Sequence, residues 1–179
     1  MTAMTTSIPT IFVYAYGSNM LTQRIKKRCP SAEPIGIATL EGHELRWHKR
    51  SRDESGKCNV VESAAAGAVV FGVLFQIAVA EKPALDRAEG VGSGYEEKSA
   101  TVTCNGESHN ASIYFATDIE DSLQPYTWYK ALVVAGAKEH CLPAAYVAQL
   151  EAAEAVKDPN AGRHTSNMVM ANDAPGMAQ

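Results

Sequence analysis

The sequence lacks the short motifs on which several large enzyme classes depend. Its 179 residues contain no GxxxxGK(S/T) phosphate-binding loop, no GxSxG nucleophile turn and no HExxH zinc motif. The four cysteines, Cys29, Cys58, Cys104 and Cys141, are far apart and form no CxxC pair. We therefore expect free thiols, no metal site and no cofactor.

Long apolar runs and a basic excess are absent as well. No stretch approaches the roughly 20 apolar residues that cross a bilayer, and the start, MTAMTTSIPT, has neither the basic region nor the apolar core of a signal peptide. The formal net charge is -4, and we interpret the basic stretches at 24–28 and 46–52 as a solvated helix face or a loop. We expect a cytoplasmic protein that binds neither nucleic acid nor a membrane.

The stretch YAYGSNM (14–20) breaks an apolar run with glycine. The alternation before the glycine predicts a strand over 10–16, and MLTQRIKKR after it has helical spacing, with Asn19 as the expected N-cap. Free N–H groups and the positive end of a helix would meet at this turn, which suits an anion such as a carboxylate. The alternative is a strand-to-helix junction that binds nothing.

Strand signals fill the first two thirds of the chain, and helix signals follow. Residues 68–76 are apolar on both faces and predict a central strand, and Asn105-Gly106 predicts a hairpin turn. The pattern favours an α+β fold with a mostly antiparallel sheet that is strongly curved or closed. We expect one domain over 1–157 and a partly ordered tail over 158–179.

Glu89 stands immediately before a glycine-rich segment that contains Gly90, Gly92 and Gly94. A carboxylate at the C-terminal end of a helix faces the negative end of the macrodipole, so it needs a partner or a purpose. The glycines let a ligand or another backbone segment come close. Glu89 is therefore either a solvated residue of a surface turn or a functional carboxylate.

Three segments together resemble the γ-glutamylcyclotransferase family of the AIG2-like superfamily. They are YAYGSNM with LTQRI after it, LDRAEGVGSGY, and YKALVVAGAKEHCLP. The family's patterns are (F/Y)xYGSN(L/M), EGxxxxY and YxxxxxxGAxExxLP, and all three occur here in order. The resemblance covers residues 10–155. It departs at Cys141, where relatives often have glycine and where we expect an altered helix stop.

The resemblance implies a small, mixed β-barrel with helices packed around it and one pocket at its mouth. It implies that Glu89 is the catalytic general acid and base. It also implies substrate-binding residues at Tyr14, Ala15, Tyr16, Gly17, Ser18, Asn19 and Tyr129. Tyr146 is a weaker candidate that would close the site.

The reaction implied by the resemblance needs no cofactor. The α-amine of a small γ-glutamyl substrate attacks its own γ-carbonyl, which forms 5-oxoproline and releases an amine or amino acid. The alternatives are a γ-glutamyl hydrolase or acyltransferase on the same site, and a non-catalytic binding member of the fold. We expect a monomer or homodimer, in which the basic loop from Arg46 to Lys57 shapes the side of the site that holds the leaving group.

Overall fold

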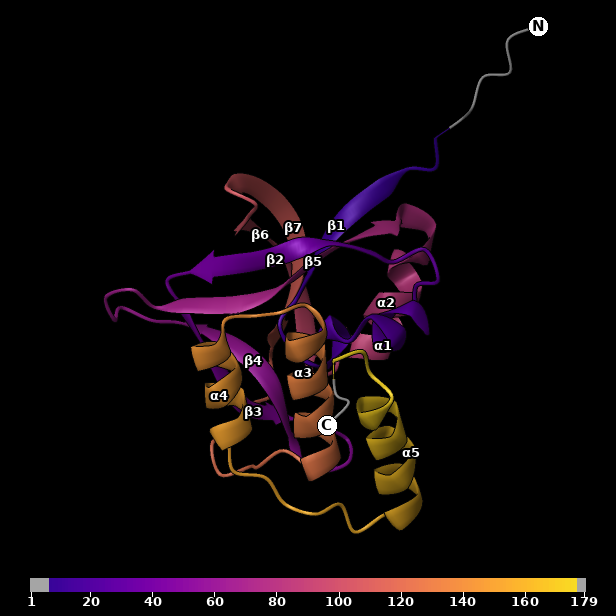
Figure 1. Ribbon diagram of the computed structural model, residues 1–179, viewed down its shortest axis with the longest axis vertical. Coiled ribbons are helices and arrows are strands. Elements are labelled where there is room, and N and C mark those ends of the chain that lie inside the picture. Colours follow the sequence, from indigo (N-terminus) through magenta and orange to yellow (C-terminus); the bar gives the residue numbers. More distant parts are fainter. Residues whose placement is uncertain (1–6, 177–179) are drawn as a thin grey trace, which may run out of the picture.

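The computed structural model describes residues 7–176, and its centre is a closed β-barrel (Figure 1). The strands are β1 (Thr10–Ala15), β2 (Glu33–Glu41), β3 (His43–Arg50), β4 (Gly56–Glu62), β5 (Val69–Ala78), β6 (Tyr95–Cys104) and β7 (Glu107–Ala116). The barrel order is β1-β5-β2-β6-β7, and a parallel bridge from β1 to β7 closes it, whereas its other pairs are antiparallel. Strands β3 and β4 form a separate antiparallel sheet. The predicted α+β class with a mixed, mostly antiparallel barrel is confirmed.

Strand β5 is central, as its apolar sequence predicts. It pairs with β1 along one edge and with β2 along the other. A side chain at Gly72 would come within 2.4 Å of the carbonyl oxygen of Ala15 and 2.7 Å of the Tyr14 ring. The glycine therefore lets the end of β1 lie directly against β5.

Strands β6 and β7 form the hairpin that the Asn105-Gly106 pair predicts. Both turn residues have positive φ, 52° and 80°, which is the backbone of the two-residue turns that match the twist of the flanking strands. The pairing runs in unbroken register back to Tyr95 opposite Ala116. Tyr95 therefore lies at the end of the hairpin that is distant from the turn.

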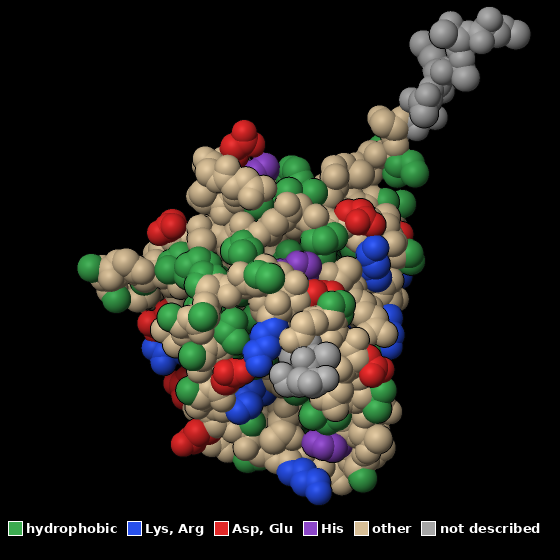
Figure 2. Space-filling model, viewed as in Figure 1, with side chains coloured by type: hydrophobic (Ala, Val, Ile, Leu, Met, Phe, Trp, Pro, Cys, Tyr) green, Lys and Arg blue, Asp and Glu red, His purple; other side chains and the backbone are tan. Residues whose placement is uncertain are grey.

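Helices cover the barrel, and α3, α4 and α5 lie side by side on one face (Figure 1). The helices are α1 (Thr22–Lys26), α2 (Lys82–Glu89), α3 (Thr127–Glu139), α4 (Ala144–Ala152) and α5 (Ala161–Asn172), with short 3-10 helices η1 (Ser18–Met20) and η2 (Val79–Glu81). A side chain at Gly136 would come within 2.5 Å of the backbone nitrogen of Leu21, so α3 packs tightly on the turn after β1. None of the helices between residues 7 and 176 is long and apolar enough to cross a membrane. Acidic and basic side chains are interspersed over the face shown in Figure 2.

The segment that the sequence predicts to be a partly ordered tail contains helix α5, which packs against α3. Asp158, just before the helix, is buried; its carboxylate accepts a hydrogen bond from Trp128 Nε1 at 2.7 Å and pairs with Arg163 at 2.5 Å. Asn160 caps the helix by accepting a hydrogen bond from the backbone nitrogen of Arg163 at 2.9 Å. Residues 161–172 of the segment expected to be partly ordered therefore form a regular helix. This helix depends on contacts with α3 more than on a periodic apolar face of its own.

Candidate active site

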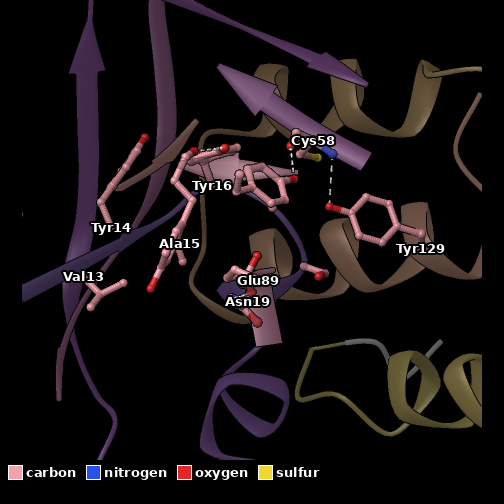
Figure 3. Close-up of a pocket in the computed structure, with 12 residues that line it drawn as sticks. Val13, Tyr14, Ala15, Tyr16, Asn19, Cys58, Glu89 and Tyr129 are labelled. Carbon is pink, nitrogen blue, oxygen red and sulfur yellow. Dashed lines mark hydrogen bonds between the residues drawn. The ribbon is translucent and has the colours of Figure 1, made fainter. Parts of the chain in front are cut away.

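One pocket at the end of β1 is lined by all eight residues that the sequence predicts for the site (Figure 3). Glu89 comes from the end of α2 and Tyr129 from the first turn of α3, while the other six come from β1 and the turn after it. The fold therefore brings together segments that are far apart in the sequence.

Four further residues line the same pocket and are not singled out by the sequence: Val13, Cys58, Tyr95 and Tyr114. Tyr95 is the last residue of the EGxxxxY pattern, so that pattern contains a signal for it. Cys58 and Tyr114 reach the pocket from β4 and β7. Only the pairing of distant strands places them there, and no local motif marks them.

The turn after β1 is built differently from the predicted helix start. Residues 18–20 form η1, and α1 begins only after Leu21, so the prediction that Asn19 is the N-cap is wrong. The Asn19 side chain instead donates from Nδ2 to Glu89 Oε1 at 2.6 Å and accepts at Oδ1 from Arg28 Nη1 at 2.8 Å. Hydrogen bonds to charged groups are stronger than a capping bond to a neutral N–H, which explains why the amide turns toward them.

Two sets of backbone N–H groups near this turn differ in whether a protein acceptor binds them. At the start of α1, the Thr22 N–H donates to Glu139 Oε2 at 2.8 Å, so a carboxylate of the protein itself already occupies this helix end. The N–H groups of Gly17, Ser18 and Asn19 donate to no acceptor within the part of the chain that the structure describes. The donors that remain for a bound oxyanion or carboxylate are thus those of the pocket lining.

The basic stretch 24–28 supports the turn and is not simply a solvated helix face. Arg24 Nε donates to Ser18 Oγ at 2.9 Å, as Arg28 does to Asn19. Burial, together with the nearby Arg28, lowers the pKa of Arg24 to about 10, so Arg24 stays cationic at neutral pH. The two arginines hold the turn by contacts with its polar side chains.

Glu89 is half-buried and lies beside Asn19 at the pocket (Figure 3). Helix α2 ends directly after it, because Gly90 has a φ of 74° and its N–H bonds back to Arg87 O at 3.2 Å. Among the described residues that line this pocket, Glu89 carries the only carboxyl group. The hydrogen bond from Asn19 contradicts the alternative of a freely solvated surface glutamate.

The other ionisable groups of the pocket are held neutral. Burial raises the pKa values of Tyr16, Tyr95 and Tyr129 well above their usual range, and it raises the pKa of the Cys58 thiol to about 12. The Tyr95 hydroxyl donates to Cys58 O at 2.6 Å, and the Tyr129 hydroxyl accepts from Cys58 N at 3.1 Å. The pocket therefore contains neither a thiolate nucleophile nor a phenolate base at neutral pH. Between residues 7 and 176, no three His, Cys, Asp or Glu side chains are grouped closely enough to hold a metal ion.

Tyr146 does not line this pocket. It packs on Phe71, with ring centroids 5.1 Å apart, in a separate groove. The sequence-based suggestion that Tyr146 closes the site is therefore not supported by its position.

A second cavity, of about 310 Å³, opens beside Glu89. Its lining includes basic side chains from β3, the loop after β3 and α2: Lys49, Arg50, Arg52 and Arg87. Lys49 is only 8% exposed, so the interpretation of 46–52 as solvated is wrong at this residue. The register of β3 against β4 shifts between Arg46 and Lys49, and such a bulge breaks the simple alternation of inward and outward side chains.

Several known proteins similar to this chain are named gamma-glutamylcyclotransferase. The family model described as the AIG2-like family matches residues 69–150. The gamma-glutamylcyclotransferase of Bos taurus is 35% identical over 148 residues, which are 79% of this chain and 77% of that protein. The protein of the same name from Homo sapiens is 35% identical over 150 residues, with coverages of 79% and 77%. A solved structure named gamma-glutamyl cyclotransferase aligns with a TM-score of 0.76 and 31% identity, over 82% of this chain and 89% of that one.

Proposed function

The chain belongs to the γ-glutamylcyclotransferase family, and from this premise we propose that its pocket cyclises a γ-glutamyl amide to 5-oxoproline with Glu89 as general acid and base. The observation that carries the assignment of Glu89 is its position: it is the only carboxyl group lining the described pocket, and Asn19 holds it there. Three backbone N–H groups that have no acceptor among residues 7–176 lie in the same lining.

The first step is the activation and attack of the substrate's own amine. Glu89 takes a proton from the α-ammonium group, because a protonated amine has no lone pair with which to attack. The amine nitrogen then bonds to the γ-carbonyl carbon and closes a five-membered ring. Holding the chain in the cyclising geometry supplies up to about 7–11 kcal/mol of the barrier reduction, which is the measured range for well-oriented intramolecular reactions.

The attack places negative charge on the former carbonyl oxygen. The N–H groups of Gly17, Ser18 and Asn19 are the donors that stabilise either this oxyanion or the α-carboxylate of the substrate. Donors aimed at a developing oxyanion are typically worth about 10²–10³ in kcat each. A turn with three donors that find no acceptor in the described part of the chain fits this use.

The last step breaks the bond between the carbonyl carbon and the leaving nitrogen. Glu89 returns its proton to that nitrogen as the carbonyl re-forms, and the carboxylate is regenerated. The ring nitrogen, which carries two hydrogens and a positive charge after the attack, gives its extra proton to the departing amine, which leaves as an ammonium ion. Glu89 is thus the base in the first step and the acid in the last, and no water is consumed. The hydrogen bond from Asn19 keeps the carboxylate in place between the two steps.

Hydrolysis or acyl transfer on the same site would use water or another amine as the nucleophile, and the products distinguish these reactions from cyclisation. A covalent route through the protein is disfavoured, because the Cys58 thiol and the buried tyrosines are held neutral at neutral pH.

The test is the Glu89→Gln variant, assayed with a panel of γ-glutamyl amino acids by quantifying 5-oxoproline. We expect a folded protein whose turnover falls by about 10²–10⁴, the usual contribution of a positioned acid or base. Glu96→Gln is the matched control, because Glu96 is exposed on β6 and pairs with Lys98 away from the pocket. Near wild-type turnover in Glu89→Gln would refute the assignment, and free glutamate as the product would reassign the protein to hydrolysis.

A further inference from the structure

The cavity beside Glu89 contains cations that the protein does not neutralise. Arg50 is paired with Asp118 at 3.4 Å and with Glu120 at 3.3 Å. The other three cations of the lining form no ion pair with any described residue: Lys49, Arg52 and Arg87. The cavity therefore has an excess of positive charge beside a single reactive carboxylate.

Lys49 is the unusual member of this group because it is buried. Its Nζ lies 4.6 Å from the centroid of the Tyr95 ring, and a side chain at Gly94 would come within 2.9 Å of the same atom. Burial lowers the pKa of Lys49, and the nearby carboxylate of Glu89 opposes that shift. A cation that is taken largely out of water and forms no ion pair with a described residue is unfavourable for the folded state. A perturbed ionisable group in a cleft is a candidate for ligand binding, and an anionic ligand would supply the missing charge.

The position of Glu89 relates this cavity to the reaction. Glu89 lines both the pocket of the YGSN turn and the basic cavity. Its carboxyl group must touch the leaving nitrogen when it returns the proton. If the glutamyl group binds at the turn, a leaving group that continues past Glu89 would enter the cavity that Lys49 lines.

We propose that the basic cavity is the subsite for the leaving amino acid and that Lys49 binds its carboxylate. This inference rests on the proposed function. It makes Lys49 a specificity-determining residue for γ-glutamyl substrates whose leaving group carries a carboxylate near the departing nitrogen. The exposed Arg52 and Arg87 favour a second carboxylate on the same leaving group, as in a γ-glutamyl conjugate of an acidic amino acid.

The test compares γ-glutamyl-alanine with γ-glutamyl-alaninamide, which has a neutral carboxamide in place of the C-terminal carboxylate. Hydrogen bonds to a charged partner predict that the wild-type kcat/KM for the acid exceeds that for the amide by about 10- to 100-fold. In Lys49→Met this ratio falls to about 1, mainly through the KM of the acid. Lys49→Arg keeps part of the preference, because it keeps the charge.

Arg46→Met is the matched control for removing one positive charge. Arg46 is on the same strand but pairs with Glu44 and does not line the cavity. We expect this variant to keep the wild-type ratio. Lys49→Gln removes the same charge and carries the test if Lys49→Met does not fold.

The ratio of the kcat/KM values for the two substrates distinguishes the possible roles of Lys49. If Lys49 acts only on the charge of Glu89, its loss lowers the turnover of both substrates equally, and that outcome overturns the subsite. An unchanged preference for the acid in Lys49→Met overturns it as well. Failure of the wild-type protein to release 5-oxoproline from either substrate would instead refute the proposed function, and the subsite with it.

Discussion

At the scale of single residues, Asn19 shows how one amide serves two charged neighbours. Its NH₂ group faces the carboxylate of Glu89 and its oxygen faces the guanidinium of Arg28. The reversed amide would place acceptor against acceptor and donor against donor. Arg28 therefore determines the orientation of Asn19, and Asn19 in turn presents a donor to Glu89. An aspartate at this position would repel the carboxylate that the asparagine holds.

Cys141 carries backbone strain that a smaller residue would remove. It ends α3 with a φ of 58°, and the N–H of Leu142 bonds back to Ala137 O at 2.9 Å, as in a helix stop made by glycine. The expectation that cysteine alters this stop is therefore wrong, because the side chain accepts the left-handed conformation instead. Since that conformation costs a non-glycine residue about 1–2 kcal/mol, we expect Cys141→Gly to raise the free energy of unfolding by about 1 kcal/mol. Denaturant titration measures this change.

Glu54→Gly is a suitable companion to Cys141→Gly. Glu54 also has a positive φ, 64°, and like Cys141 it is exposed. We expect both variants to be stabilised and to keep wild-type turnover, since neither position lines the pocket. A destabilised Cys141→Gly would show that the unfolded-state entropy of the added glycine outweighs the relief of strain.

At the scale of elements, Asp158 attaches α5 to the rest of the molecule. Its hydrogen bonds with Arg163 and Trp128 hold the pKa of its carboxyl below the usual range. The ionised form is thus favoured in the folded state, and the resulting stability is complete above the unfolded pKa of about 3.9 and is lost as the pH falls through the folded value. We expect Asp158→Asn to lower the melting temperature at neutral pH, and the difference from wild type to shrink as the pH is lowered toward 2.

Thermal unfolding between about pH 2 and pH 7 measures this effect. Asp173→Asn is the control, because Asp173 lies exposed at the other end of α5. We expect it to follow the wild-type melting curve at each pH. A constant difference between Asp158→Asn and wild type over the whole range would show that the carboxylate charge does not stabilise the attachment of α5.

The same elements show which local structure the sequence could predict. The hairpin turn was predictable because the adjacent residues Asn105 and Gly106 specify the turn without any distant contact. Helix α5 was not, because its anchor joins Asp158 to Trp128, 30 residues away. The bulge in β3 could not be predicted either. It interrupts the alternation of inward and outward side chains between Arg46 and Lys49.

At the scale of the whole molecule, the closure of the barrel and the assembly of the site depend on long-range pairing. Val13 of β1 meets Ser112 of β7 across most of the barrel sequence, and no short pattern encodes that parallel bridge. Eight of the twelve residues that line the pocket could nevertheless be named in advance, since three motifs mark them and the resemblance implies their roles. Lys49 has no motif. Its burial, and the absence of an anionic partner among residues 7–176, appear only when strand, loop and helix are assembled.

The charge distribution of the whole molecule adds a prediction about salt. The net charge of -4 would repel anionic substrates, and charges of both signs are mixed over the face in Figure 2, so attraction depends on the local basic cavity. γ-Glutamyl-glutamate carries three carboxylates and one ammonium, whereas γ-glutamyl-alaninamide has no net charge. Because Arg52 and Arg87 are exposed, their attraction is screened by ions.

We therefore expect the KM for γ-glutamyl-glutamate to rise by about threefold or more between roughly 0.02 M and 0.5 M ionic strength, while the KM for γ-glutamyl-alaninamide stays nearly constant. Steady-state kinetics at matched pH measures both values. The double variant Arg52→Gln/Arg87→Gln should lose most of the salt dependence, since it keeps Lys49 but removes the cations that solvent ions can screen. An equal salt effect on both substrates would mean that the rim arginines do not act on the leaving group, and that the preference for acidic substrates resides in the buried Lys49 alone.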